Sequence, residues 1–100
     1  MAHPPLPPVH PGEILREEFL LPLDLTPYAL ASALGVPRTR IERLAREDTA
    51  MTADTALRLA RYFGTSAEFW MNLQALYDVR EAQGRLAAEI AAITPREEAA

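Results

Sequence analysis

The chain has 100 residues, of which 49% are hydrophobic, and a formal net charge of -4. That length supports one domain with one core, and the acidic balance excludes a nonspecific polyanion binder with an overall basic surface. The lack of cysteine excludes disulfides, thiolate metal sites and a cysteine nucleophile, and it fits a reducing cytoplasm. The first ten residues hold four prolines and no apolar run, and no later stretch is long enough to span a bilayer. We therefore expect a cytoplasmic protein with no signal peptide and no membrane partner.

Charge is distributed unevenly along the chain. The segment from Arg38 to Arg61 holds six arginines against four acidic residues, a net of +2, which leaves -6 for the rest. The middle of the sequence is therefore a relatively basic island in an acidic chain.

Residues 1–10 are rich in proline and short of backbone donors, so we expect a flexible arm. His3 and His10 lie in this arm with no carboxylate or thiol between them, which is a weak metal signal. We interpret both as solvated histidines, and we expect no metal and no cofactor. The arm remains available for contact with a partner.

The first helix is predicted to begin at Pro11, because proline suits the first helical position and Glu13 and Glu17 lie toward the positive end. It should end at Leu21-Pro22, since the residue before a proline is disfavoured in the helical region. Its predicted buried face consists of Ile14, Leu15, Phe19 and Leu20.

The stretch from Pro27 to Leu44, PYALASALGVPRTRIERL, has the spacing of a helix-turn-helix. Thr26 is the predicted N-cap of its first helix, and Gly35 should supply the positive φ of the turn. Ala31 is small enough for two helix backbones to approach closely. Apolar residues at helical spacing should face the core of the domain, and they are Leu30, Leu34, Val36, Ile41 and Leu44. A β-branched residue at Gly35 is the substitution expected to unfold the protein.

Three more helical segments follow. Thr52 should cap a helix that ends at Gly64, with Ala53, Ala56, Leu57, Ala60 and Phe63 as its apolar face. Thr65 and Glu68 have capping-box spacing for the next helix, whose apolar stripe is Phe69, Trp70, Leu73, Leu76 and Tyr77. A weaker helical pattern spans Leu86 to Ile93, and the end of the chain should fray. The prediction is an all-α fold: a compact five-helix domain over residues 11–80, a C-terminal helical extension over 81–94 and a disordered tail over 95–100.

Three stretches resemble the HigA family of antitoxins, within the wider Xre/Cro and lambda-repressor-like helix-turn-helix group. They are PGEILREEFL, ALASALGVPRTRIERL and, most specifically, MTADTALRLARYFGTSAEFWMNLQALYD, and together they span about residues 10 to 80. The resemblance implies a DNA-binding domain that dimerises, represses its own operon and neutralises a HigB-type toxin, an endoribonuclease of the RelE fold. Two other functions stay open, namely a stand-alone regulator without a toxin and a toxin-binding protein with weak DNA binding.

The predicted third helix carries the candidate DNA contacts. Arg38, Thr39 and Arg40 are expected to read base edges in the major groove of operator DNA, because arginine can pair bidentately with guanine. Phosphate contacts are assigned to Arg43 and Arg46 on this helix and to Thr26 and Tyr28 at the start of the preceding one. The alternative is a solvated basic face on which Arg43 pairs with Glu47 at helical spacing.

One segment departs from the family pattern. Where relatives often carry glycine with a lysine or arginine, this chain has Arg46-Glu47-Asp48-Thr49-Ala50. Two acidic residues then occupy a position at which a phosphate contact is expected, which favours weaker DNA binding than in relatives. Pro27 likewise replaces a glutamine that contacts phosphate in many Xre-like domains.

Aromatic and aliphatic residues late in the chain exceed what five short helices bury in one monomer. Core packing explains part of each side chain, and a two-fold homodimer would cover the rest, with Trp70, Leu73 and Tyr77 as the predicted interface. Such a dimer places two recognition helices about 34 Å apart, one turn of DNA. We expect no enzyme activity, because no nucleophile lies near a candidate base and no glycine-rich phosphate loop exists.

Overall fold

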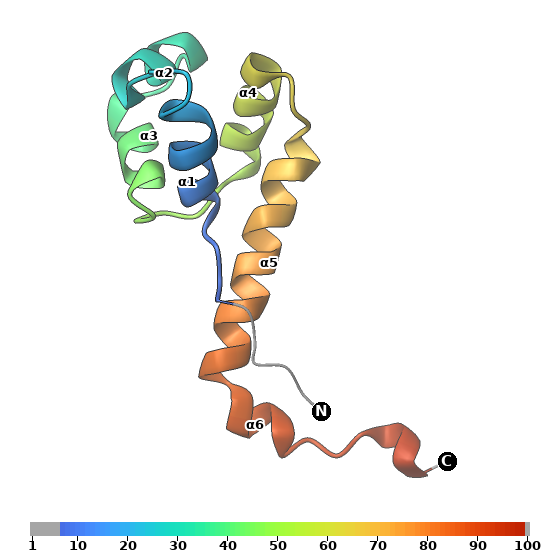
Figure 1. Cartoon of the computed structure of the whole chain (residues 1–100). Helices are drawn as coiled ribbons and strands as arrows, with labels where there is room; N and C mark the ends of the chain where they lie inside the picture. Colours follow the sequence, from blue (N-terminus) through green and yellow to red (C-terminus); the bar gives the residue numbers. More distant parts are fainter. Residues whose placement is uncertain (1–6, 100) are drawn as a thin grey trace.

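The computed structural model describes residues 7–99, which form helices joined by short loops and contain no strand. A compact group of helices at one end of the molecule continues into a long helix that leads away from it (Figure 1), so the protein measures 56 × 23 × 22 Å. The predicted all-α fold is confirmed. The helices are α1 (Pro11–Ile14), η1 (Leu15–Leu20, a π-helical continuation of α1), α2 (Pro27–Leu34), α3 (Arg38–Ala45), α4 (Ala53–Phe63), α5 (Ala67–Arg85), α6 (Ala87–Ala91) and η2 (Arg96–Ala99, a 3-10 helix).

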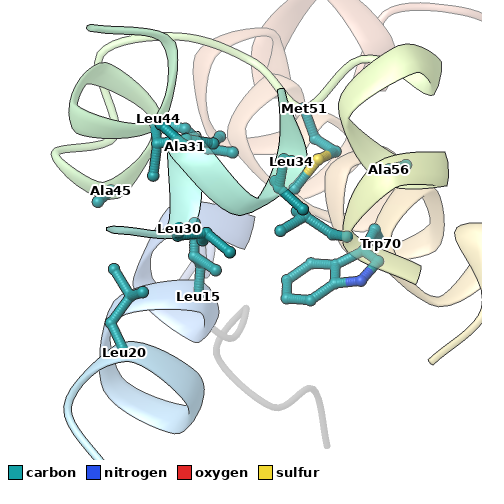
Figure 2. Close-up of a cluster of buried hydrophobic side chains, with 12 residues drawn as sticks. Leu15, Leu20, Leu30, Ala31, Leu34, Leu44, Ala45, Met51, Ala56 and Trp70 are labelled. Atoms are coloured by element: carbon teal, nitrogen blue, oxygen red, sulfur yellow. The ribbon is translucent and has the colours of Figure 1, made fainter. Parts of the chain in front are cut away.

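The core lies between η1, α2, α3, α4 and the first half of α5 (Figure 2). Trp70 is completely buried, and its indole nitrogen donates a hydrogen bond to Thr65 Oγ1 at 2.8 Å. Phe19 contributes from η1, with its ring 5.1 Å from that of Trp70. Trp70 therefore packs α5 against η1.

The predicted helix ends are mostly confirmed. Thr26 and Thr52 cap α2 and α4 by accepting backbone N–H groups, and Gly35 and Gly64 end those helices with φ of 72° and 77°. The predicted cap of α5 is wrong by one residue. Ser66, whose Oγ accepts from Phe69 N–H at 3.0 Å, is the N-cap, because Thr65 instead accepts from the Trp70 indole.

Two predicted features at the start of the chain need correction. Residues 1–6, including His3, lie outside the described residues, but His10 is buried rather than solvated. Its Nδ1 accepts the Gly12 N–H at 2.9 Å and so caps α1, and its ring lies edge-on to Tyr77 at 4.9 Å. The expected flexible arm therefore reaches the folded domain at its last residue.

The close backbone approach at Gly12 was not identified from the sequence. A Cβ at Gly35 would have ordinary contact with Arg58, 3.7 Å away, whereas a Cβ at Gly12 would lie 1.8 Å from the carbonyl oxygen of Leu44. Gly12 is therefore the residue that lets α1 pack directly on the end of α3.

On α4, Leu59 is buried, whereas Leu57, which was predicted to lie on the apolar face, is 62% exposed. Helix α5 continues without a break past residue 80, where the sequence analysis placed a domain boundary. Residues 96–99 form the one-turn η2, and the disordered tail stays a prediction.

Candidate nucleic-acid interface

The turn between α2 and α3 is closed by two backbone hydrogen bonds. Val36 N–H donates to Ala31 O at 3.0 Å, and Gly35 N–H donates to Ser32 O at 3.3 Å. Gly35 adopts the left-handed conformation that this pattern requires, which glycine accepts without strain. Ala31 is 2% exposed, as expected for the small residue at the crossing of two helices. The helix-turn-helix predicted from spacing is present.

Helix α3 is held by its apolar side, which leaves its polar side open to solvent. Ile41, Leu44 and Ala45 are buried in the core, so residues on the opposite side of this helix face outward. Arg38, Thr39, Arg40 and Arg43 are exposed on that side. The structure thus brings together the three predicted base contacts and one predicted phosphate contact.

A groove of about 560 Å³ lies beside this exposed face, and we call it the α3–α4 groove. Its polar lining combines arginines, threonines and one carboxylate, which is a suitable set for hydrogen bonding to DNA. The polar lining residues are Thr39, Arg40, Arg43, Thr49, Thr52, Asp54 and Thr55.

The arginines of α3 differ in their partners. Arg38 Nε lies 3.3 Å from Glu42 one turn further on, and Arg40 Nη1 lies 2.8 Å from Asp54 Oδ1 at the start of α4. Within residues 7–99, Arg43 has no carboxylate at ion-pair distance. The alternative pairing of Arg43 with Glu47 is therefore wrong, and the phosphate contact of Arg43 stays a prediction.

Asp54 is shared between two arginines. Its Oδ1 accepts from Arg58 Nε at 2.8 Å as well as from Arg40 Nη1 at 2.8 Å. Hydrogen bonds from Arg58 and then from Arg40 hold the pKa of Asp54 below its usual value. Sequence reasoning missed Asp54, although its position four residues before Arg58 was a signal for the pair between Asp54 and Arg58.

The acidic segment after α3 is also paired. Glu47 has φ of 67°, in the left-handed region, directly after the end of α3. Asp48 N–H donates to Arg43 O at 2.8 Å and Glu47 N–H to Leu44 O at 2.9 Å, which completes the same helix-ending pattern as at Gly35. The Glu47 carboxylate lies 3.2 Å from Arg16, and Asp48 lies 3.2 Å from Arg46. Both negative charges therefore have a cationic neighbour.

Arg16 was not singled out by sequence reasoning, yet it ties η1 to the end of α3. Its Nη1 donates to Ala45 O at 2.5 Å, and its other nitrogens face Glu17 and Glu47. The hydrogen bond that Arg16 donates to Glu17 raises the pKa of Arg16 above its usual value. Desolvation acts in the opposite direction, and the hydrogen bond that Arg16 donates to Glu47 raises the pKa further. A cation at this helix end is favourable because the free carbonyls there carry partial negative charge.

The other predicted phosphate contacts lie at two places on the surface. Thr26 and Tyr28 are exposed at the start of α2, although Thr26 Oγ1 also accepts the Ala29 N–H at 3.0 Å. Arg46 is exposed just after α3 and shares its charge with Asp48. These assignments stay predictions.

The predicted dimer interface needs one correction. Trp70 is 0% exposed, so it belongs to the core of the monomer and has no surface to offer a partner. Leu73 packs partly against the core, and Tyr77 lies beside His10. Larger apolar surfaces on α5 belong to Leu76 and Val79, which are 45% and 53% exposed.

Residues 7–99 contain no group of three or more histidine, aspartate or glutamate side chains arranged to hold a metal ion. Within the same part of the chain, no helix combines the length and the apolar character needed to cross a bilayer.

Comparison with known proteins gives a consistent class. The helix-turn-helix family matches residues 15–70. Virulence-associated protein I of Dichelobacter nodosus is 54% identical over 78 residues, which cover 78% of this chain and 72% of that protein. Antitoxin HigA-1 of Vibrio cholerae is 38% identical over 88 residues, which cover 88% of this chain and 83% of the relative. Among solved structures, the Pseudomonas aeruginosa antitoxin HigA with the higBA promoter is 48% identical, with a TM-score of 0.85 over 89% of this chain and 98% of that one.

The turn between α2 and α3, the exposed basic side of α3 and the family match define a helix-turn-helix protein of the DNA-binding class, which is non-enzymatic. Within that class, the chain belongs to the HigA family of antitoxins, in the Xre-like helix-turn-helix group.

Proposed function

We propose that this protein is an antitoxin that, as a homodimer, binds operator DNA upstream of its own gene and represses that operon, and that it neutralises a HigB/RelE-type endoribonuclease toxin. The observation that carries the DNA half is the outward face of α3, on which Arg38, Thr39, Arg40 and Arg43 are exposed while Ile41 and Leu44 are buried. The similarity of this chain to the solved antitoxin HigA with the higBA promoter supports DNA binding.

Arg38, Thr39 and Arg40 lie in the first turn of α3. The first residues of a recognition helix are those that reach base edges when the helix enters the major groove. Arg43, one turn on, meets the phosphate backbone, together with Arg46 and the α2 residues Thr26 and Tyr28. Phosphate contacts fix the register of the helix, and base contacts supply the sequence preference.

A homodimer through α5 fits the exposed apolar side chains of that helix. Leu76 and Val79 are each about half exposed, and Leu73 and Tyr77 lie on the same helix closer to the core. Covering these surfaces in a two-fold dimer removes apolar area from water and presents two α3 helices to one face of DNA. Light scattering tests this: a Leu76→Arg/Val79→Arg variant should be monomeric, whereas Leu57→Arg on α4 should remain dimeric. A wild type with monomer mass would contradict the dimer.

The weak-DNA-binding alternative was motivated by Glu47 and Asp48. Because Arg16 and Arg46 lie 3.2 Å from these two carboxylates, their repulsion of phosphate is partly offset. These two ion pairs favour an affinity for DNA that Glu47 and Asp48 do not strongly weaken. Arg46, which shares its charge with Asp48, is the weakest of the predicted phosphate contacts.

Two experiments test the two halves of the proposal. In a gel shift, the protein should retard a duplex from the region upstream of its own gene at a lower concentration than a scrambled duplex of equal composition. For the toxin half, the product of the adjacent reading frame should arrest growth alone and not when co-expressed with this protein. Failure to retard the upstream duplex at low salt would refute the DNA half, and persistent arrest would refute the antitoxin half. A stand-alone regulator would show the retardation without the rescue.

A further inference from the structure

A chain of three polar contacts links the helices around the α3–α4 groove. Arg58 Nη1 donates to Leu34 O, the last carbonyl of α2, at 2.8 Å. Arg58 Nε then donates to Asp54 Oδ1 at 2.8 Å, and the same oxygen accepts from Arg40 Nη1 at 2.8 Å. The side chain of Arg40 on α3 is therefore held by α4, and α4 is in turn tied to α2.

This arrangement contributes little to folding. The side chains of Arg40, Asp54 and Arg58 are 41%, 55% and 43% exposed, and ion pairs at that exposure are weak because water screens them. A carboxylate in this groove also opposes the phosphate backbone. The Asp54 carboxylate is therefore better explained by its hydrogen bond with Arg40 than by a contribution to folding stability or to general affinity for DNA.

The geometry leaves the reading edge of Arg40 available. Asp54 occupies only Nη1, while the guanidinium presents five N–H donors in one plane. The edge formed by Nε and Nη2 matches the N7 and O6 acceptors of guanine, which is the commonest specific contact of arginine with DNA. A side chain already held in one plane loses less freedom when it forms this pair.

We propose that Asp54 is a positioning residue that orients the Arg40 guanidinium toward a guanine, and that it thereby raises the preference of this protein for its operator over other DNA. The inference rests on the proposed operator binding. Removal of Asp54 has two effects of opposite sign. Nonspecific affinity rises because one negative charge leaves the groove, and the preference for operator falls because Arg40 is no longer held.

Fluorescence anisotropy tests this with the full-length protein, the duplex from upstream of its gene and a scrambled duplex of equal composition. In Asp54→Asn, the ratio of the two affinities should fall up to about fivefold, the most that an exposed ion pair can contribute by holding Arg40 in place. Asp48→Asn is the matched control, since it removes the same charge from a residue that pairs with Arg46 instead. Its ratio should remain within about twofold of the wild type, because loss of one charge changes both affinities together.

Two further variants separate the effect of the position of the Asp54 carboxylate from the effect of its charge. Asp54→Glu keeps the charge but displaces the carboxylate by one methylene, so the affinity ratio should fall while affinity for the scrambled duplex stays unchanged. In an Arg40→Ala background, Asp54→Asn should cause no additional loss of the ratio. Thermal unfolding of each variant shows that it is folded at the temperature of the assay.

The outcomes distinguish this inference from the proposed function. If the wild type prefers its upstream duplex and Asp54→Asn keeps that preference, or if Asp48→Asn loses it equally, the role of Asp54 is overturned and operator binding stands. If the wild type shows no preference for the upstream duplex, the proposed operator binding itself is wrong.

Discussion

Gly12→Ala adds a single methyl group, and we expect it to lower the free energy of unfolding more than other substitutions of that size. The added Cβ would lie 1.8 Å from Leu44 O, and real Cβ atoms stay at least 3.0 Å from such neighbours, so α1 and α3 must separate by about 1.2 Å. Leu44 O cannot turn away freely, because it accepts the Glu47 N–H at 2.9 Å and so helps to end α3. Overpacking typically lowers the free energy of unfolding by about 1 to 3 kcal/mol. We expect a loss of about 3 kcal/mol here, because the neighbouring atom belongs to rigid backbone. That loss lowers the melting temperature of a domain of this size by roughly 12 to 24 °C.

Two other glycines provide matched controls for this prediction. Gly84 lies within α5 with nothing within 4 Å of a Cβ, so Gly84→Ala should stabilise the protein by about 0.5 to 1 kcal/mol. Gly64 is equally open but has φ of 77°, so Gly64→Ala should cost about 1 kcal/mol through backbone strain alone. Urea unfolding followed by circular dichroism measures all three. If Gly12→Ala unfolds at the same urea concentration as Gly84→Ala, the close approach of α1 to α3 is refuted.

Four more predictions follow from the same structure. Glu47→Gly should be more stable in urea than Glu47→Ala by about 1 kcal/mol, because only glycine relieves the positive φ; equal stability would contradict strain at this position. Trp70→Ala should cost about 3 to 5 kcal/mol, since the side chain is fully buried; a loss below about 1 kcal/mol would place it outside the core. Arg43→Ala should reduce the slope of log affinity against log salt by about 1, and an unchanged slope would remove Arg43 from the phosphate contacts. Arg58 and Arg40 lower the pKa of Asp54, so the ion pairs of Asp54 should be lost only as pH falls through that lowered pKa. The preference for operator over scrambled DNA should therefore be constant from about pH 8 to about pH 5. A decline of this preference already near pH 6 would contradict the role of the Asp54 carboxylate.

The features that the sequence predicted correctly are those governed by local rules. Thr26, Gly35, Thr52 and Gly64 mark helix ends by the chemistry of one or two residues, so their positions could be read without the fold. The buried side of α3 followed from apolar periodicity in the same way. These local features were enough to place the exposed arginines of α3.

The features that the sequence missed depend on contacts between distant segments. Gly12 matters because Leu44 of another helix lies against it, and His10 is buried because Tyr77 of α5 covers it. Trp70 could not be assigned between core and interface until the packing of Phe19 against it was known. The pairing of Arg40 with Asp54 joins residues 14 apart in sequence and has no periodic signature.

The most direct test of the account is the affinity of an Arg38→Ala/Arg40→Ala variant for the upstream duplex. Its control is Arg85→Ala/Arg96→Ala, which removes the same charge from exposed positions in α5 and η2. If α3 reads the operator, the first variant should bind at least about 30-fold more weakly than the wild type, from two base contacts of about 1 kcal/mol or more each. The control should change affinity by less than about threefold, since exposed charges far from the DNA are screened. Equal affinity of the two variants would contradict the claim that this helix recognises DNA.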